Sequence, residues 1–115
     1  MGKRTLQVGR LIRNALAELI IEMRDPRVKE VTLTDVVIST DLLYAKVYVD
    51  VFGDEAEAAR AIRALERASG YLRRCLAERL NLRNTPELRF LFDSDLRRGE
   101  RVSRLLRDTE EPGDE

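Results

Sequence analysis

Hydrophobic residues recur in the first part of the chain at the spacing of one helix face. Between Arg4 and Arg24 they follow the period of an amphipathic helix, at Val8, Ile12, Ala15, Leu16, Leu19 and Met23. Pro26 disfavours helical backbone at Asp25 and has no amide donor of its own. The pattern therefore predicts one long helix that ends at Arg-Asp-Pro-Arg, where we interpret Asp25 and Arg27 as an ion pair across the bend.

Two segments rich in β-branched residues follow and indicate a hairpin. The first, VTLTDVVIS at 31–39, loses its alternation near Asp35 and Val36, which predicts a bulge. The second, YAKVYVDVF at 44–52, alternates strictly. One of its faces should be buried and the other partly solvated. The connection between the segments is short, so the two strands should be antiparallel.

The segment from Asp54 to Arg83 has the composition of helix, yet Ser69 and Gly70 interrupt it. Asp54 can cap its start, and Glu57 can complete a capping box. Glycine inside a helix costs about 1 kcal/mol relative to alanine. The apolar stripes before and after the glycine nearly join, so the pattern leaves open one kinked helix or two. These stripes are Ala58, Ala61, Ile62 and Leu65, then Leu72, Cys75, Leu76 and Leu80.

The last part of the chain predicts a third strand at 87–93, with Leu88, Phe90 and Phe92 on its apolar face. A short helical turn is expected around 102–106. The acidic, apolar-free residues 108–115 should form a disordered tail. We expect a single domain over residues 1–107.

The order of elements predicts an α+β fold with two layers. It reads α-β-β-α-α-β, which gives a three-stranded sheet with the helices on one face. The βααβ crossover should place the last strand parallel to the strand that it left. The junction between the second and third helices is Ala68-Ser69-Gly70, which we expect to be a kink.

Charge is segregated along the chain, although 21 basic and 21 acidic side chains give a net charge of zero. Residues 60–83 carry seven basic and two acidic side chains, or +5, and residues 1–27 carry six and three, or +3. Residues 28–59 and 108–115 come to −5 each. Because a polyanion responds to the local potential rather than to the sum, the two basic regions suit nucleic acid. They equally suit solvated helix faces.

Candidate chemistry is sparse. The chain has no histidine, no metal-ligand cluster and no phosphate-binding glycine-rich loop, so we expect neither an enzyme nor a cofactor. The single cysteine, Cys75, should be a small buried hydrophobe, and its isolation fits a reducing cytoplasm. We expect no signal peptide, because the N-terminal residues lack a continuous apolar run of the needed length. We also expect no membrane span, because no stretch approaches roughly 20 apolar residues. We expect a soluble, cytoplasmic monomer.

The glycine at the helix junction suggests where nucleic acid would bind. In KH domains, a glycine-containing turn lets a nucleic-acid backbone approach the amide groups of the following helix. The usual G-x-x-G is replaced here by Ala-Ser-Gly, so that loop geometry does not simply transfer. Alternatively, Gly70 only lets two helices pack at an angle. The candidate RNA-binding residues are Lys3, Arg4, Arg10, Arg13, Arg63, Arg67, Ser69, Gly70, Arg73 and Arg74.

A second hypothesis is a protein-docking module. The solvated strand face that carries Tyr44, Lys46 and Tyr48, or the edge of the sheet, would then bind a partner protein, with RNA contact secondary. Tyrosine on an open sheet face more often simply covers the sheet, which is the alternative to docking.

Several stretches together resemble the bacterial ribosome-binding factor A family. They occur in the family's order and cover most of residues 4–106: DPR at 25–27, STDLLYAKVYV at 39–49, ASGYLR at 68–73, PELRFLFDSD at 86–95 and GERVSRLL at 99–106. Each is weak alone, but YAKVYV, ASG and PEL-x-F at these spacings are specific in combination. The Ala-Ser-Gly junction is itself characteristic of that family.

The resemblance implies a type II KH-like domain that binds the free small (30S) ribosomal subunit and its 16S ribosomal RNA. It also implies a role in late maturation of that subunit, including processing of the 5′ end of the RNA, and an association with cold adaptation. The expected partners are therefore the 30S subunit, 16S ribosomal RNA and ribosomal proteins. In the docking alternative, a ribosomal protein is the partner and RNA contact is secondary.

Overall fold

The computed structural model describes residues 3–93, and of Lys3 only the backbone. The expected turn at 102–106, the acidic tail at 108–115 and the basic residues Arg97, Arg98, Arg101 and Arg104 lie outside the described residues. The proposed domain boundary at residue 107 lies outside them as well, and it stays a prediction.

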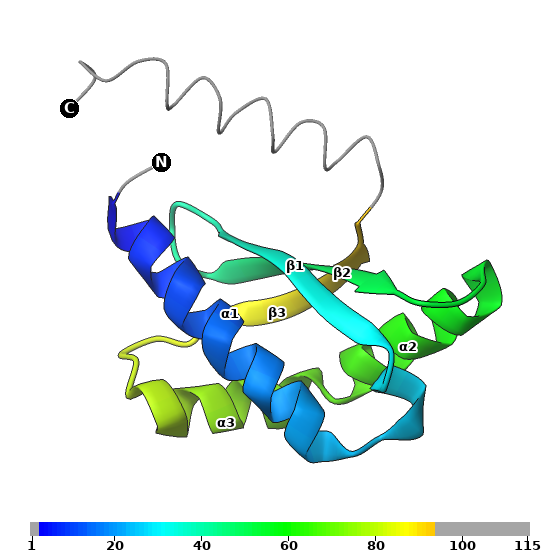
Figure 1. The fold of residues 1–115 in the computed structure, drawn as a ribbon. Coiled ribbons are helices and arrows are strands. Elements are labelled where there is room, and N and C mark those ends of the chain that lie inside the picture. Colours follow the sequence, from blue (N-terminus) through cyan, green and yellow to red (C-terminus); the bar gives the residue numbers. More distant parts are fainter. Residues whose placement is uncertain (1–2, 94–115) are drawn as a thin grey trace, which may run out of the picture.

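The described elements follow the predicted order α-β-β-α-α-β (Figure 1). A short 3-10 helix, η1, adds one turn after the first helix. The bounds are α1 Lys3–Met23, η1 Pro26–Val28, β1 Val31–Ile38, β2 Tyr44–Val51, α2 Glu55–Arg67, α3 Ser69–Leu80 and β3 Glu87–Phe92. The expected ends of the first helix and of the three strands are each confirmed to within one residue.

The sheet has the strand order β1-β2-β3, and both predicted directions are confirmed. Strand β2 is antiparallel to β1 and parallel to β3. The register of β1 against β2 shifts between Leu33 and Asp35, which confirms the bulge. The extra residue changes the parity of the strand. Leu33 before it and Val36 after it can therefore both contribute to the core.

All three helices cover one face of the sheet, and the core lies between the two layers (Figure 1). Its centre is aliphatic, as expected from the low aromatic content. The large aliphatic side chains that are fully buried are those of Ile12, Leu16, Ile38, Val47, Val49, Leu65, Leu72 and Leu76. The opposite face of β2 and β3 is open within the described part of the chain, with Lys46, Arg89 and Leu91 exposed.

Two burial predictions were wrong. Phe92 was expected on the apolar face of β3 with Leu88 and Phe90, but as the last residue of the strand it is 49% exposed. Cys75 was expected to be buried but is only partly so. It packs at the margin of the core, beside the fully buried Leu72 and Leu76 of the same helix.

Local interactions account for where the helices begin and end. The side chain of Asp54 accepts a hydrogen bond from the Glu57 amide at 2.8 Å, and the Asp54 amide donates to the Glu57 carboxylate at 3.3 Å, so the predicted capping box is confirmed. Helix α3 ends at Leu80, and its C-cap residue, Asn81, adopts left-handed backbone with φ 51°. Asparagine tolerates that conformation better than most residues.

Candidate nucleic-acid interface

The α2–α3 junction consists of two helices separated by a single residue. Helix α2 ends at Arg67, α3 begins at Ser69, and Ala68 between them has φ −86° and ψ 0°. The Ala68 amide still donates to Ala64 of α2, and the Ala68 carbonyl accepts from Leu72 of α3. The break therefore falls at the first of the three residues singled out in the sequence, and Gly70 lies in the first turn of α3.

The first turn of α3 has no side-chain cap, because its N-cap residue is Ala68. The first amide groups of any helix lack partners within the helix and carry the positive end of its dipole. Gly70 is exposed at this end. The uncapped amide groups at the positive end of the α3 dipole thus lie at the surface here.

Gly70 is not required by the packing of the two helices. A Cβ atom built at Gly70 would meet only Nη1 of Arg74, at 3.8 Å, which is ordinary van der Waals contact. Gly53, and not Gly70, is the glycine with positive φ among the described residues. Neither space nor backbone conformation demands glycine at position 70. The same distance places the guanidinium of Arg74 directly beside the open backbone.

Arg63 and Arg67 lie one turn apart on α2, so their side chains share a side of the helix. Both are exposed, as is Arg74. Within residues 3–93, none of the three forms an ion pair or a side-chain hydrogen bond. Their guanidinium groups are therefore available to an external anion.

Arg73 has a different environment from its neighbour. Its Nε and Nη2 atoms donate to the carbonyl oxygen of Thr85 at 3.0 and 2.8 Å. This pair of bonds ties α3 to the loop that leads into β3. Arg73 is exposed, and the two N–H donors of Nη1 and the second donor of Nη2 remain for a ligand.

The basic residues of α1 divide between two places. Arg4 and Arg10 are exposed on the helix, whereas Arg13 lines a cleft of about 820 Å³ between α1 and β1. Arg24 and Lys29 line the same cleft, and neither was predicted from the sequence as a site residue. No sequence signal would have found them, because the cleft exists only where helix and strand are brought together.

The Asp25–Arg27 ion pair is confirmed. The guanidinium lies 2.7 Å from the carboxylate, and the Arg27 amide also donates to it at 2.9 Å. These contacts lower the pKa of Asp25 to about 2, first through the side-chain hydrogen bond from Arg27 and then through its amide. Both charges are satisfied locally, so this tripeptide closes a turn and offers no free charge to a ligand.

The open face of the sheet carries the residues of the protein-docking hypothesis. The Arg89 guanidinium lies over the Tyr44 ring, 4.5 Å from its centroid, and also donates to Glu87. Lys46 is exposed between the two tyrosines. One side of the Tyr44 ring is therefore covered, which leaves its edge and its hydroxyl group for other contacts.

Residues 3–93 contain no cluster of three or more His, Cys, Asp or Glu that could hold a metal ion. Among these residues there is also no helix with the length and apolar character that crossing a membrane requires.

A family model described as ribosome-binding factor A matches residues 4–106. The chain belongs to the ribosome-binding factor A family. It is 38% identical to the ribosome-binding factor A of Halothermothrix orenii over 110 residues, which are 95% of this chain and 90% of that protein. The resemblance inferred from the separate sequence stretches is thereby confirmed.

Solved structures of ribosome-binding factor A share the fold. The crystal structure of the Thermus thermophilus protein matches with a TM-score of 0.68 at 37% identity, covering 76% of this chain and 93% of that one. A homology model of the Thermus thermophilus protein, fitted into a cryo-electron microscopy map of a complex between 30S and ribosome-binding factor A, matches with a TM-score of 0.59 at 40% identity. That match covers 70% of this chain and 85% of the other. The chain is a ribosome-binding factor by family, with the element order and sheet predicted for it.

Proposed function

We propose that this chain binds the free 30S ribosomal subunit and its 16S ribosomal RNA during late maturation of the subunit. Membership of the ribosome-binding factor A family supports this, as does the 30S complex of the related Thermus thermophilus protein. In this role the chain acts in the cytoplasm as a monomer without a cofactor. It assists processing of the 5′ end of the RNA and contributes to cold adaptation.

The α2–α3 junction carries the proposed RNA contact. The single observation behind it is that the uncapped first turn of α3, the side-chain-free Gly70 and the guanidinium of Arg74 coincide on the surface. Helix amide groups bind phosphate oxygens through their hydrogen bonds and dipole. A guanidinium can engage two such oxygens with its planar donors. Packing does not require glycine at position 70. Close approach of an RNA backbone would explain why a residue without a side chain lies there.

The other basic residues extend the contact. Arg63 and Arg67 add positive charge on the α2 side, Ser69 adds a hydroxyl, and Arg73 adds its remaining donors. The proposed set also includes Lys3, Arg4, Arg10 and Arg13 of α1. Bound in this way, the factor favours an immature arrangement of the RNA over the mature one. It can do so only as far as its affinity for the immature arrangement exceeds its affinity for the mature one. It is therefore released as the surrounding RNA folds.

Binding to purified 30S subunits across a salt series tests the proposal. For about three or four phosphate contacts, affinity should fall by roughly 20- to 150-fold when salt rises about fourfold. A flat affinity would remove phosphate contact as the main source of binding.

Charge-reversal variants test the location. Arg67→Glu combined with Arg74→Glu should weaken binding and flatten the salt dependence. The matched control is Arg24→Glu combined with Lys29→Glu, which changes the net charge equally but lies at the α1–β1 cleft and should retain the slope. A third variant, Tyr44→Ser with Tyr48→Ser, addresses the open sheet face. If only this third variant lost binding, the protein-docking hypothesis would replace the RNA contact.

A further inference from the structure

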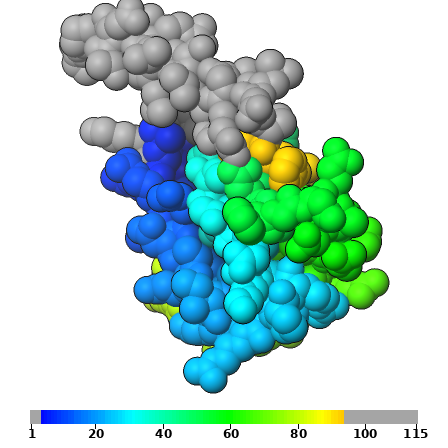
Figure 2. Space-filling model, turned by 45° about the vertical axis from the view of Figure 1, so that its right-hand side comes forward, coloured from blue at the N-terminus to red at the C-terminus, as the bar shows by residue number. Residues whose placement is uncertain are grey.

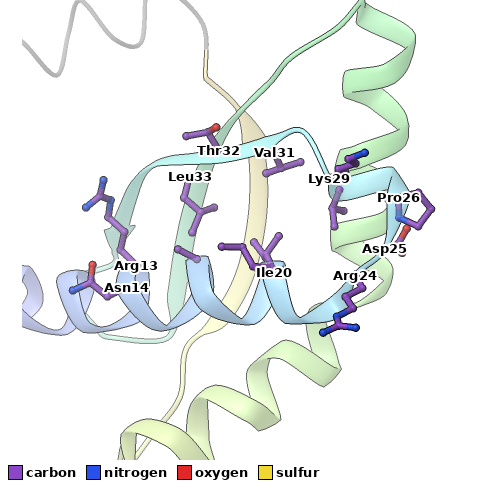
Figure 3. A pocket seen from close by; sticks show the side chains of 13 residues that line it. Arg13, Asn14, Ile20, Arg24, Asp25, Pro26, Lys29, Val31, Thr32 and Leu33 are labelled. Carbon is purple, nitrogen blue, oxygen red and sulfur yellow. The ribbon is translucent and has the colours of Figure 1, made fainter.

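The cleft between α1 and β1 has an apolar lining, to which η1 also contributes. Its volume is about 820 Å³, within the range of ligand-binding pockets. In Figure 3, Leu33 of β1 points toward α1, and Ile20 of α1 faces it across the cleft. Ile21 is also part of the lining and is 77% exposed. An exposed isoleucine beside a hollow is an apolar surface without a partner among the described residues.

The cleft opens along the free edge of the sheet. Within residues 3–93, β1 pairs only with β2, and Figure 2 shows β1 reaching the surface beside α1. At one end α1 closes this edge, because Gly9 lies against the carbonyl oxygen of Val36. At the other end, between Arg13 and Lys29, helix and edge are separated by the cleft.

The unpaired backbone groups of that edge can be identified from the register. The Phe52 amide donates to the Glu30 carbonyl, so these two residues form a hydrogen-bonded pair. Hydrogen-bonded and non-bonded pairs alternate in an antiparallel ladder. Val31 and Leu33, opposite Val51 and Val49, are therefore non-bonded positions whose N–H and C=O groups point away from β2. Both residues line the cleft.

The rim of the cleft is positively charged. Arg13, Arg24 and Lys29 contribute cations that form no ion pair within the described part of the chain. The one carboxylate of the lining, that of Asp25, is held by Arg27. A ligand that suits the cleft thus combines apolar side chains for the lining, negative charge for the rim and an extended backbone for Val31 and Leu33.

We propose that this cleft binds an extended, acidic and apolar peptide segment of a partner protein, which joins the sheet as a strand beside β1. Strand addition of this kind uses backbone hydrogen bonds for affinity and side-chain pockets for specificity. The apolar lining and the unpaired backbone donors and acceptors at the edge of β1 suit a peptide strand. RNA would need only the cations of the rim, so these two features favour a peptide over RNA. Apart from Arg13, the site shares no residue with the proposed RNA contact, and it does not depend on the contact at the α2–α3 junction.

A defined peptide tests this site. The probe is an acetylated, amidated hexapeptide of alternating valine and glutamate, added to the full-length ¹⁵N-labelled protein. Its binding should shift the amide resonances of Val31 and Leu33 and slow their hydrogen exchange at peptide concentrations up to about 1 mM, which corresponds to weak binding. The same peptide N-methylated at every residue has no residue amide left to donate to β1 from either edge and should bind at least tenfold more weakly. Equal binding of both peptides, or no effect at Val31 and Leu33, overturns the proposal.

A charge swap gives the specificity control. A peptide of alternating valine and lysine should bind the natural protein more weakly than the glutamate peptide, and Arg24→Glu with Lys29→Glu should reverse that order. If the variant still bound the glutamate peptide more tightly than the lysine peptide, the rim cations would not be what selects an acidic peptide. The Arg67→Glu, Arg74→Glu variant should bind the glutamate peptide normally even if it fails on the 30S subunit, which separates this site from the RNA contact. If a uridine decamer perturbs Val31 and Leu33 and displaces the peptide, the cleft is an RNA site and the proposal fails.

Discussion

Gly9 of α1 lies against the carbonyl oxygen of Val36 in β1, so that a Cβ atom at position 9 would be 3.3 Å from that oxygen. The strand backbone is held by its pairing with β2 and cannot easily move away. The long helix can approach the edge of the sheet this closely because the residue has no side chain. Gly70, by contrast, has open space around it.

The two glycines should therefore respond oppositely to alanine. Gly9→Ala should lower the free energy of unfolding by up to about 2 kcal/mol, because crowding outweighs the gain of about 1 kcal/mol in helix propensity. Gly70→Ala should raise it by up to about 1 kcal/mol. Urea denaturation of both variants gives the comparison. Stabilisation by Gly9→Ala would show that helix and strand can separate without cost.

Gly70→Ala also separates folding from function. If the open backbone at Gly70 admits an RNA phosphate, the variant should be more stable and yet bind the 30S subunit less tightly. Binding equal to that of the natural protein would show that the added methyl group does not block the approach, and Gly70 would lose its place in the interface.

The Asp25–Arg27 pair predicts a lowered pKa for the carboxyl group of Asp25. Its contacts lower the pKa of the Asp25 carboxyl group from 3.8 to about 2. The pair therefore contributes stability above about pH 4, and this contribution is lost as the pH falls through about 2. The carboxyl carbon of Asp25, followed by NMR, should titrate near the lower value. In Arg27→Gln the midpoint should move up toward 3.8. An unmoved midpoint would mean that Arg27 does not hold the carboxylate in solution.

The capping box of α2 predicts a stability loss. Asp54→Ala removes the acceptor of the Glu57 amide and should lower the free energy of unfolding by about 1 kcal/mol. Glu55→Gln, in the same helical turn, leaves the box intact and should change stability by at most about 0.5 kcal/mol. Thermal or urea unfolding checks both, and equal losses would assign the effect to charge near the helix end rather than to the cap.

Arg73 and Arg74 should separate into a structural and a binding residue. Arg73→Gln loses the two bonds to the Thr85 carbonyl and should cost about 1 kcal/mol of stability. Arg74→Gln should leave stability within about 0.5 kcal/mol but weaken 30S binding more than Arg73→Gln does. Both substitutions remove one charge, so each is the charge control for the other. If Arg73→Gln weakened 30S binding more than Arg74→Gln, Arg73 would be the binding residue of the two.

Much of the fold was predictable from local patterns. Helical spacing from Val8 to Met23, strict alternation after Tyr44 and the capping pair at Asp54 each depend on a few neighbouring residues. The slipped alternation at Asp35 predicted the bulge for the same reason, since it reflects the face to which each side chain must point. The errors at Phe92 and Cys75 arose because burial at the margin of a core depends on what covers it.

The sequence by itself determined the order and type of the elements, the ion pair across Pro26 and the family, because all of these are written in residue spacing. Only the tertiary structure decided which arginines remain free, because Thr85 and Arg73 are brought together by the path of the chain after α3. It also decided that Gly9 closes one end of the β1 edge while a cleft leaves Val31 and Leu33 open at the other. Such relationships between a helix and a distant strand depend on how the layers pack, and no local pattern encodes them.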